Sequence, residues 1–287
     1  MHTPAASPNP KRAIVLGGGG VTGIAWEVGL LTGLLEAGLP LPAATAIIGT
    51  SAEAFVGVAL ASDHGLPRLF AAQAAPSPAE VAATPPATLF KAWGEAFSQG
   101  GADRQRVGQA FGTIAKANPA PVPAAQRQAA VASRLVTQQW PATLHITALD
   151  ADTGALHLFD RTSGVTLTEA VTASGAVPGV WPLVTLLGRP WVDGGMVSST
   201  NLLLAQAYER VLVLAPLPQG YGAMPGAAAD AQTLRATAAV LLLTPDAESQ
   251  TAIGPNIYDP ARRGDTAAAG RQQGLRVAAE VRALWGD

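Results

Sequence analysis

Residues 13–23 read AIVLGGGGVTG, and this stretch decides the fold. A short run that is apolar throughout, such as 13–16, is typical of a strand buried on both faces of a parallel sheet. After the glycines, apolar residues recur at helical spacing over 22–35. A second short strand at 46–48 and a helix at 52–61 repeat the arrangement. Together these segments predict the opening of a doubly wound α/β fold.

The rest of the chain continues to alternate strands and helices, without an internal repeat. Further strands are predicted at 144–151, 156–160, 191–192, 211–215 and 240–243, the first two as a hairpin that turns at 152–154. Further helices are predicted at 126–137, 167–173, 202–208 and 261–284. Few linkers interrupt the pattern, which favours a single domain over 13–287.

Two segments depart from this pattern. Residues 1–12 contain three prolines and no apolar run, which predicts a disordered N-terminal tail rather than a signal peptide. Over 63–125, Pro, Ala and Gln dominate, with short helical pieces near Leu69, 90–97 and 107–117. We interpret 63–125 as a helical insert or lid, and a plain scaffold segment is an equally good interpretation.

The composition excludes several classes of protein. The 287 residues carry 18 Lys and Arg against 20 Asp and Glu, and 13% are charged while 48% are hydrophobic. This excludes an intrinsically disordered chain and argues against binding to nucleic acid. Without cysteine there is no disulfide, thiolate metal site or cysteine nucleophile. No apolar run approaches the roughly 20 residues of a spanning helix, so a cytoplasmic protein is expected.

The glycine-rich loop invites two chemical interpretations. Gly18, Gly20 and Gly23 match the dinucleotide-binding pattern G-x-G-x-x-G, but that site also needs an acidic residue after the next strand. The next strand instead runs into Thr50 and Ser51. Alternatively, bare amides at the start of a helix can surround an anion or a developing oxyanion. A tight turn without a ligand explains the same glycines.

A serine and an aspartate are the candidate catalytic residues. Ser51 lies in GTSAE (49–53) between a strand and a helix, which suits a nucleophile elbow or a simple N-cap. Asp193 begins DGG at a strand end, which suits a general base or a turn. No histidine follows Asp193, so the order serine, acid, histidine cannot be met. If Asp193 is the acid, the residues therefore point to a Ser–Asp dyad, which a raised aspartate pKa would assist.

Four motifs in order resemble those of the patatin-like phospholipases, a family with bacterial members. They are the glycine loop at 18–23, the elbow at 49–53, the segment ASGAVP at 173–178 and the turn at 193–195. The later segment GPNIYDPARR is similar to bacterial members as well. The resemblance covers most of 13–217 and leaves 63–125 without a counterpart.

The resemblance implies a three-layer α/β/α sandwich with a mostly parallel central sheet. It also implies a lipid acyl hydrolase that forms an acyl-enzyme and needs neither metal nor cofactor. The implied roles are nucleophile for Ser51, base for Asp193, oxyanion hole for Gly18, Gly19 and Gly20, and motif support for Gly23, Gly49, Gly194 and Gly195. The expected partner is a lipid or other ester, with at most transient contact with a membrane surface through apolar residues of the insert. Those residues are Leu66, Leu69, Phe70, Leu89, Phe90, Trp93 and Phe97.

Two positions depart from the family pattern. Thr22 stands where the loop usually carries Arg or Lys, and Glu53 stands where the elbow usually ends in glycine. A Glu53 carboxylate that faced Ser51 would oppose an oxyanion, whereas one in solvent would suit the first turn of a helix. The alternative function is therefore a patatin-fold protein with impaired catalysis that binds acyl chains or lipids.

Overall fold

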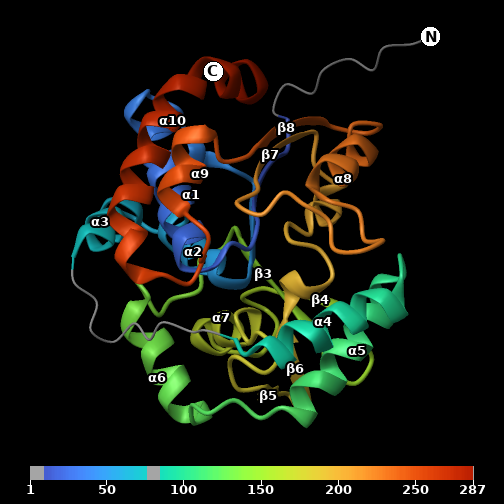
Figure 1. The fold of residues 1–287 in the computed structure, drawn as a ribbon. Coiled ribbons are helices and arrows are strands. Elements are labelled where there is room, and N and C mark those ends of the chain that lie inside the picture. Colours follow the sequence, from blue (N-terminus) through green and yellow to red (C-terminus); the bar gives the residue numbers. More distant parts are fainter. Residues whose placement is uncertain (1–9, 76–84, 287) are drawn as a thin grey trace.

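The computed structural model describes residues 10–75 and 85–286, and its centre is a mixed β-sheet (Figure 1). Residues 1–9 of the predicted tail and residues 76–84 of the predicted insert lie outside the described residues. The strands of the described chain follow the order β5-β6-β3-β2-β1-β7-β8, and β4 pairs with β3. Their bounds are β1 Arg12–Leu16, β2 Ala46–Thr50, β3 Leu144–Asp150, β4 Leu156–Phe159, β5 Val184–Leu186, β6 Arg189–Asp193, β7 Arg210–Leu214 and β8 Ala239–Leu243.

The pairings among β3, β2, β1, β7 and β8 are parallel, whereas β4 and β6 each pair antiparallel with β3, and β5 pairs antiparallel with β6. The strand order reverses at β1, which has β2 on one side and β7 on the other. Ligands of open α/β sheets bind beyond the carboxyl ends of the strands at such a reversal. The glycine loop begins there, directly after β1.

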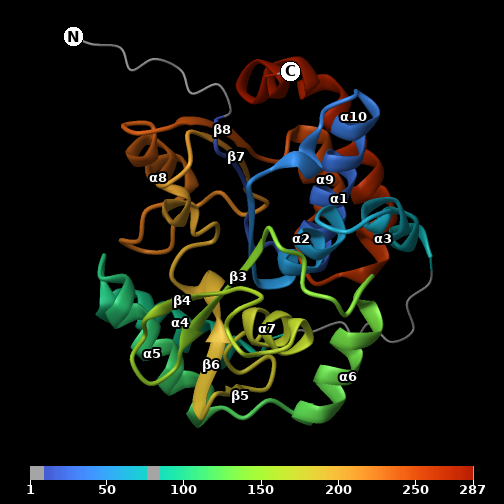
Figure 2. The same cartoon turned by 180° about the vertical axis from the view of Figure 1, so that it is seen from behind.

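Helices cover both faces of the sheet and complete the predicted three layers (Figures 1 and 2). One layer contains α1 Gly20–Glu36, α2 Ala54–Leu60, α3 Gly65–Ala74, α6 Ala124–Arg134, α7 Leu167–Ser174, α9 Ala247–Ile253 and α10 Arg263–Trp285. The other contains α4 Ala87–Gly100, α5 Arg104–Ala117 and α8 Ala227–Leu234. No helix of residues 10–75 and 85–286 is long and apolar enough to cross a bilayer.

Alternate residues of the central strands supply two separate hydrophobic cores. In β1, Ile14 and Leu16 pack in the core beneath α1, α2 and α10, whereas Ala13 and Val15 face α8. Successive side chains of a strand point to opposite faces, so an apolar run is needed where both faces are covered. The continuous apolar pattern of 13–16 is explained by this double burial.

A close contact between α1 and α10 holds the middle of α1 against α10. A Cβ added to Gly29 would overlap the backbone of α10, and one added to Gly274 would overlap the backbone of α1. The indole of Trp26 donates to Oε1 of Gln273 at 2.8 Å across the same contact. The helix that carries the glycine loop is therefore held against the helix that follows the segment 254–259.

The structure corrects the sequence predictions at several short elements. The helix predicted at 202–208 is one 3-10 turn, Leu202–Ala205, after which the amide of Glu209 already donates to the carbonyl of Lys11, next to β1. Strand β5 and helices α8 and α9 were not predicted. The insert supplies α3, α4 and α5, of which α5 packs on β3 and β6. Of its apolar residues, Leu66 and Leu89 are buried, whereas Phe90 is 53% exposed.

Candidate active site

Ser51 stands on a sharp turn between β2 and the helical segment that follows. Its φ is +61°, in the left-handed region that serine seldom adopts. A 3-10 turn, Ser51–Glu53, leads into α2. The amide of Ser51 donates to Oγ of Ser174 at 2.8 Å, at the end of α7, and this bond supports the strained turn. The geometry is that of a nucleophile elbow at the carboxyl edge of the sheet.

Asp193 reaches Ser51 because β3 pairs with two strands along one edge. Thr147 of β3 pairs with Thr50, the last residue of β2. The next residue of β3, Ala148, pairs with Asp193, the last residue of β6. Strand β4 pairs with β3 across both positions and so occupies the opposite edge. Strands β2 and β6 therefore lie end to end along the same edge of β3, and their last residues, Thr50 and Asp193, are neighbours, which brings Asp193 beside the residue that precedes Ser51.

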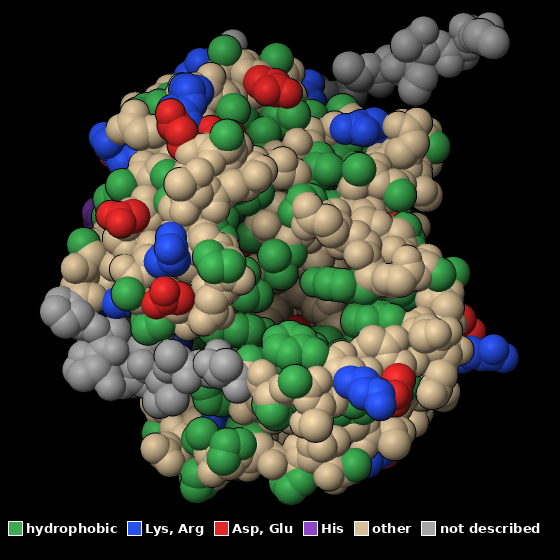
Figure 3. Space-filling view, in the orientation of Figure 1, with side chains coloured by type: hydrophobic (Ala, Val, Ile, Leu, Met, Phe, Trp, Pro, Cys, Tyr) green, Lys and Arg blue, Asp and Glu red, His purple; other side chains and the backbone are tan. Residues whose placement is uncertain are grey.

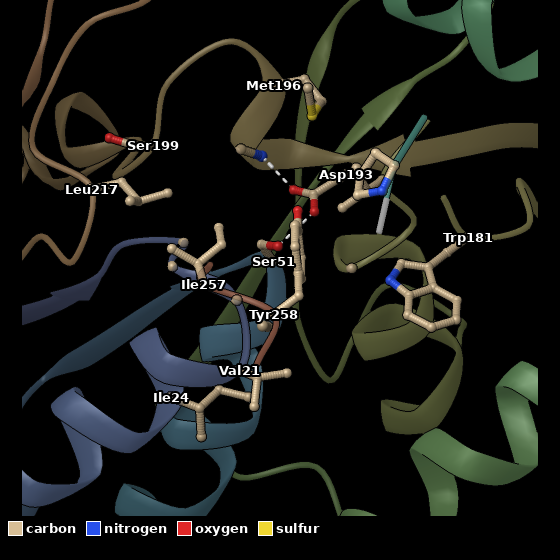
Figure 4. A pocket seen from close by; sticks show the side chains of 18 of the residues that line it. Val21, Ile24, Ser51, Trp181, Asp193, Met196, Ser199, Leu217, Ile257 and Tyr258 are labelled. Carbon is tan, nitrogen blue, oxygen red and sulfur yellow. Dashed lines mark hydrogen bonds between the residues drawn. The ribbon is translucent and has the colours of Figure 1, made fainter. Parts of the chain in front are cut away.

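The two side chains form a direct hydrogen bond. The Ser51 hydroxyl donates to Oδ2 of Asp193 at 2.5 Å (Figure 4). Oδ1 accepts the amide of Gly195 at 2.7 Å. Asp193 is 2% exposed, and burial raises its pKa to about 7, although these hydrogen bonds and the charge of Arg127 oppose the rise. A carboxyl with this pKa can accept and return a proton near neutral pH.

Gly49 and Gly194, two glycines of the predicted motifs, lie where neighbouring parts of the chain pack too closely for a side chain. A Cβ on Gly49 would lie 2.9 Å from Cα of Ala54, at the start of α2. A Cβ on Gly194 would lie 2.5 Å from Oγ1 of Thr147. Side chains at these positions would separate the elbow from its helix and the Asp193 turn from β3.

The three candidate oxyanion glycines differ in what their amides do. The amide of Gly18 donates to the carbonyl of Ser199 at 2.7 Å, which removes it from the predicted set of donors. Gly19 is the N-cap of α1, and Gly20, with φ +68°, is its first residue. Among the described backbone groups, neither of these two amides has an acceptor. Gly19 and Gly20 thus remain candidates at a helix N-terminus that favours negative charge, although the amide of Gly19 also faces the Glu53 carboxyl and lowers its pKa against the larger effect of burial.

Glu53 does not face solvent, and its carboxyl lies near enough to the dyad for the charge of Asp193 to add to the rise in pKa that burial causes. It is 0% exposed and its carboxyl lies beneath the glycine loop, where a Cβ added to Gly18 would be 3.7 Å from Oε2. A Cβ added to Gly23 would collide with Oε1. Gly23 therefore provides the space that the Glu53 side chain occupies.

A second buried carboxyl lies close to Glu53. Glu27 of α1 is also 0% exposed. Burial raises the pKa of Glu27 well above its ordinary value, and the charge of Glu53 adds to the rise. Burial likewise raises the pKa of Glu53, although the amides of Gly19 and of Glu53 itself lower it. Both carboxyls are thus disposed to hold protons at pH values where exposed glutamates have lost them.

A polar network behind the dyad was not recognised from the sequence. The side-chain amide of Asn201 donates to Oγ1 of Thr50 at 3.2 Å and to the carbonyl of Gly194 at 3.0 Å. The Thr147 hydroxyl donates to Oγ1 of Thr50 at 3.1 Å. These bonds connect the end of β2 to β3 and to the turn after Asp193. Ser174 was quoted only as part of a motif, and nothing in its sequence context indicates a bond to the Ser51 amide.

The dyad lies in a cavity of about 700 Å³ whose lining is largely apolar. Figure 3 shows the opening as a hollow surrounded by hydrophobic side chains. Its walls come from the glycine loop, α4, α6, the segment before β5 and the segment 255–258. A cavity of this size and character is typical of a binding site for an apolar small molecule.

Tyr258 is a further cavity residue that sequence reasoning missed. Its side chain extends towards Ser51 and Asp193 (Figure 4). Burial and the nearby charge of Asp193 raise its pKa, so the hydroxyl stays protonated and can donate a hydrogen bond. Neither His145 nor His157 belongs to the described lining of the cavity. Among the described residues, no three side chains of His, Cys, Asp or Glu converge as a metal site.

Comparisons with solved structures find two bacterial proteins, VipD and ExoU. VipD from Legionella pneumophila aligns with a TM-score of 0.46 and 12% identity, over 96% of this chain and 67% of VipD. The type III effector ExoU aligns with a TM-score of 0.45 and 16% identity, over 95% of this chain and 53% of ExoU. ExoU from Pseudomonas aeruginosa in complex with SpcU gives 0.39 and 16%, over 98% of this chain and 54% of that one. The chain thus spans about half to two thirds of these structures.

A comparison of the sequence with protein families identifies the family of this chain. No curated protein matches the chain. The model of the patatin-like phospholipase family matches residues 14–205, a span that contains the glycine loop, the elbow and Asp193. The chain therefore belongs to the patatin-like phospholipase family.

Proposed function

We propose that this protein hydrolyses carboxylic esters of lipids, with Ser51 as nucleophile and Asp193 as general base. The observation that carries the proposal is the 2.5 Å hydrogen bond from the Ser51 hydroxyl to Asp193, made from a left-handed elbow inside an apolar cavity. A serine needs an adjacent base to become a nucleophile, and this carboxylate is in place.

In the proposed mechanism, Ser51 Oγ attacks the ester carbonyl while its proton moves to Oδ2 of Asp193. The amides of Gly19 and Gly20 stabilise the oxyanion of the tetrahedral intermediate. The intermediate collapses as Asp193 returns the proton to the leaving alcohol, and an acyl-serine remains. Water then attacks the acyl group, Asp193 accepts a proton from it, and the second collapse releases the carboxylic acid and regenerates the Ser51 hydroxyl.

The pH dependence of turnover follows from the pKa of Asp193. The base must be ionised before Ser51 can transfer its proton, and its pKa is raised to about 7. We expect kcat/KM for a neutral ester to rise about tenfold per pH unit below pH 7 and to level off above it. A plateau that extends down to pH 5 would show that a different group is the base.

Active-site labelling tests the proposal directly. Wild-type protein treated with a fluorophosphonate is expected to gain one adduct in its intact mass, because only an activated serine reacts quickly. Ser51→Ala is expected to gain none, and Ser199→Ala, which changes another serine of the same cavity, is expected to label like wild type. Labelling of Ser51→Ala at the wild-type rate would locate the nucleophile elsewhere.

The second candidate function is an acyl or lipid binder with impaired catalysis. The position of Glu53 beneath the loop, with the amide of Gly19 facing its carboxyl, favours it. A folded wild-type protein that binds a fatty acid but neither labels nor hydrolyses esters would support this function over the hydrolase.

A further inference from the structure

The glycine loop offers fewer free donors to an oxyanion than its three glycines suggest. The loop lies against the nucleophile, since a Cβ added to Gly18 would be 3.2 Å from Cβ of Ser51. The Gly18 amide, however, already donates to a backbone carbonyl, and the Gly19 amide also faces the buried Glu53 carboxyl. Of the three amides, only that of Gly20 has no described competing acceptor. An oxyanion formed on Ser51 would therefore gain from a donor supplied by another part of the chain.

The segment 255–258 is bound directly to the glycine loop. The carbonyl of Ile257 accepts the Thr22 amide at 3.1 Å and the Thr22 hydroxyl at 3.3 Å. The same carbonyl lies beside Gly20, where an added Cβ would be 3.0 Å from it. Thr22 is itself buried in the first turn of α1. These contacts hold the next residue of the segment, Tyr258, beside the loop.

The Tyr258 side chain ends near the dyad without a hydrogen bond of its own. It lines the cavity and extends towards Ser51 and Asp193 (Figure 4). Among the residues that the structure describes, its hydroxyl has neither a donor nor an acceptor partner. Burial raises the pKa of Tyr258 most, and the charges of Asp193 and of Glu53, which lies beneath the loop, add to the rise. The hydroxyl is therefore close to both carboxyls and keeps a proton that it can donate to a substrate.

Tyr221 is the other tyrosine of the cavity, and it is held differently. Its ring stacks on Phe97 of α4, with the ring centroids 5.0 Å apart and the planes inclined by 18°. Burial and the charge of Asp193 raise its pKa, but Glu53 is not among the causes. Tyr221 thus approaches the dyad from the α4 side, whereas Tyr258 approaches it from the glycine loop. Of the two hydroxyls, that of Tyr258 is the one on the oxyanion side.

We propose that Tyr258 is a catalytic residue of the oxyanion hole, whose hydroxyl donates a hydrogen bond to the ester carbonyl oxygen as that oxygen becomes negative. This inference rests on the proposed function and adds a residue to its machinery. Ser51 Oγ bonds to the carbonyl carbon, its proton moves to Asp193, and the electron pair of the carbonyl double bond passes to the oxygen. Tyr258 keeps its own proton throughout. It donates in both tetrahedral intermediates, because acylation and deacylation place the oxyanion at the same donors.

Tyr258→Phe removes the hydroxyl and keeps the ring that lines the cavity. We expect kcat for a carboxylic ester to fall about 10²-fold with KM nearly unchanged, because the lost bond is made mainly in the transition state. At about pH 8.5 Asp193 is ionised, so a change in its pKa does not contribute. Tyr208→Phe, at a tyrosine outside the described lining, should keep wild-type kinetics, and Tyr221→Phe should lose less than about tenfold. Thermal unfolding verifies that the variants are folded.

A ligand without a leaving group distinguishes the oxyanion from the leaving alcohol. An alkyl trifluoromethyl ketone adds to a nucleophilic serine as a hemiketal whose oxygen is negative, and it has no alkoxide to expel. Its Ki should rise about tenfold or more in Tyr258→Phe. The matching trifluoromethyl carbinol cannot add to Ser51, so its Ki should be the same in both proteins. An unchanged ketone Ki beside a lowered kcat would mean that Tyr258 assists the leaving alcohol, and would overturn the assignment to the oxyanion.

Thr22 is expected to act through Tyr258 as a positioning residue. Thr22→Val keeps the size of the side chain and removes the hydroxyl bond to the Ile257 carbonyl. We expect kcat to fall about threefold, and the double variant with Tyr258→Phe to be no slower than Tyr258→Phe alone. Losses that multiply in the double variant would show that Thr22 does not act through Tyr258, and would overturn this role.

The failure of this inference and the failure of the proposed function give different results. If Ser51 is not the nucleophile, wild type neither reacts with the fluorophosphonate nor hydrolyses esters, and both proposals are refuted together. If only the inference is wrong, wild type labels and hydrolyses, and Tyr258→Phe keeps kcat within about threefold of it. A loss in Tyr221→Phe as large as that in Tyr258→Phe would likewise refute the choice of Tyr258. Active wild type, a 10²-fold slower Tyr258→Phe and its weaker ketone binding would support both proposals.

Discussion

Asp193→Asn is expected to lower kcat/KM for a carboxylic ester by about 10³-fold while the protein remains folded. Asparagine keeps the shape of the side chain and can still accept the hydrogen bond of the Ser51 hydroxyl, but it cannot take up the proton. The loss should appear in kcat rather than in KM, because Asp193 acts on the reacting atoms and not on the acyl chain. Steady-state kinetics, with thermal unfolding to verify the fold, would measure it.

Non-additivity provides the control for this prediction. Ser51→Ala should be about as inactive as Asp193→Asn, and the double variant should be no worse than either, because the two residues act as one unit. The matched control is Asp230→Asn, a buried aspartate that pairs with Arg104 away from the cavity lining. It should reduce stability rather than the kcat of the folded fraction. If Asp193→Asn kept activity within tenfold of wild type, Asp193 would be a turn residue and the base would be another group.

The sequence alone predicts where a loop lies relative to the sheet when local backbone geometry determines that position. A buried strand that runs into glycines, and a serine that follows another buried strand, each produce a loop at the carboxyl edge whatever the remainder of the chain does. This is why Ser51 and the glycine loop were located correctly with respect to the sheet. The predicted three layers follow for the same reason, since the strands of 13–16 and 211–215 are apolar on both faces.

The meeting of Ser51 and Asp193 depends on strand register, which a single sequence does not encode locally. Thr50 and Asp193 are neighbours only because Thr147 and Ala148 are consecutive in β3 and pair with different strands. A slip of one residue would turn Asp193 to the other face of the sheet. The family resemblance supplied this pairing, and the residues alone left Asp193 as a base or a turn.

The missed elements share a physical cause. Helices α8 and α9 have eight and seven residues, and β5 has three, so none is long enough to show a clear period. Their formation depends on packing, as when Ala231 and Leu234 of α8 fill the core beside β7. The bond from the Ser51 amide to Ser174 was missed because it joins residues 123 positions apart.

The sequence left open whether Glu53 impairs catalysis. Because Glu53 is buried, two substitutions at this position are informative. The raised pKa means that folded protein holds a proton that the unfolded chain releases above about pH 4.5. The contribution of Glu53 to folding stability is therefore greatest below that pH and declines as pH rises towards the folded-state pKa. Glu53→Gln cannot ionise, so its Tm should match wild type near pH 4.5 and exceed it by a few degrees at pH 8.

Glu53→Gly tests whether the side chain supports the glycine loop or restrains catalysis. Glycine removes the atoms that fill the space beside Gly23 and loosens the start of α2, so it should be less stable than Glu53→Gln by about 2–4 kcal/mol. We expect its kcat/KM to fall about tenfold or more, because Gly19 and Gly20 lose the support that aims their amides. Glu53→Gln should stay within a few fold of wild type, because it keeps that support. An increase of kcat/KM in Glu53→Gly would show instead that Glu53 restrains the oxyanion loop, and would favour the lipid-binding function. Urea unfolding and ester kinetics on the same three proteins separate the two explanations.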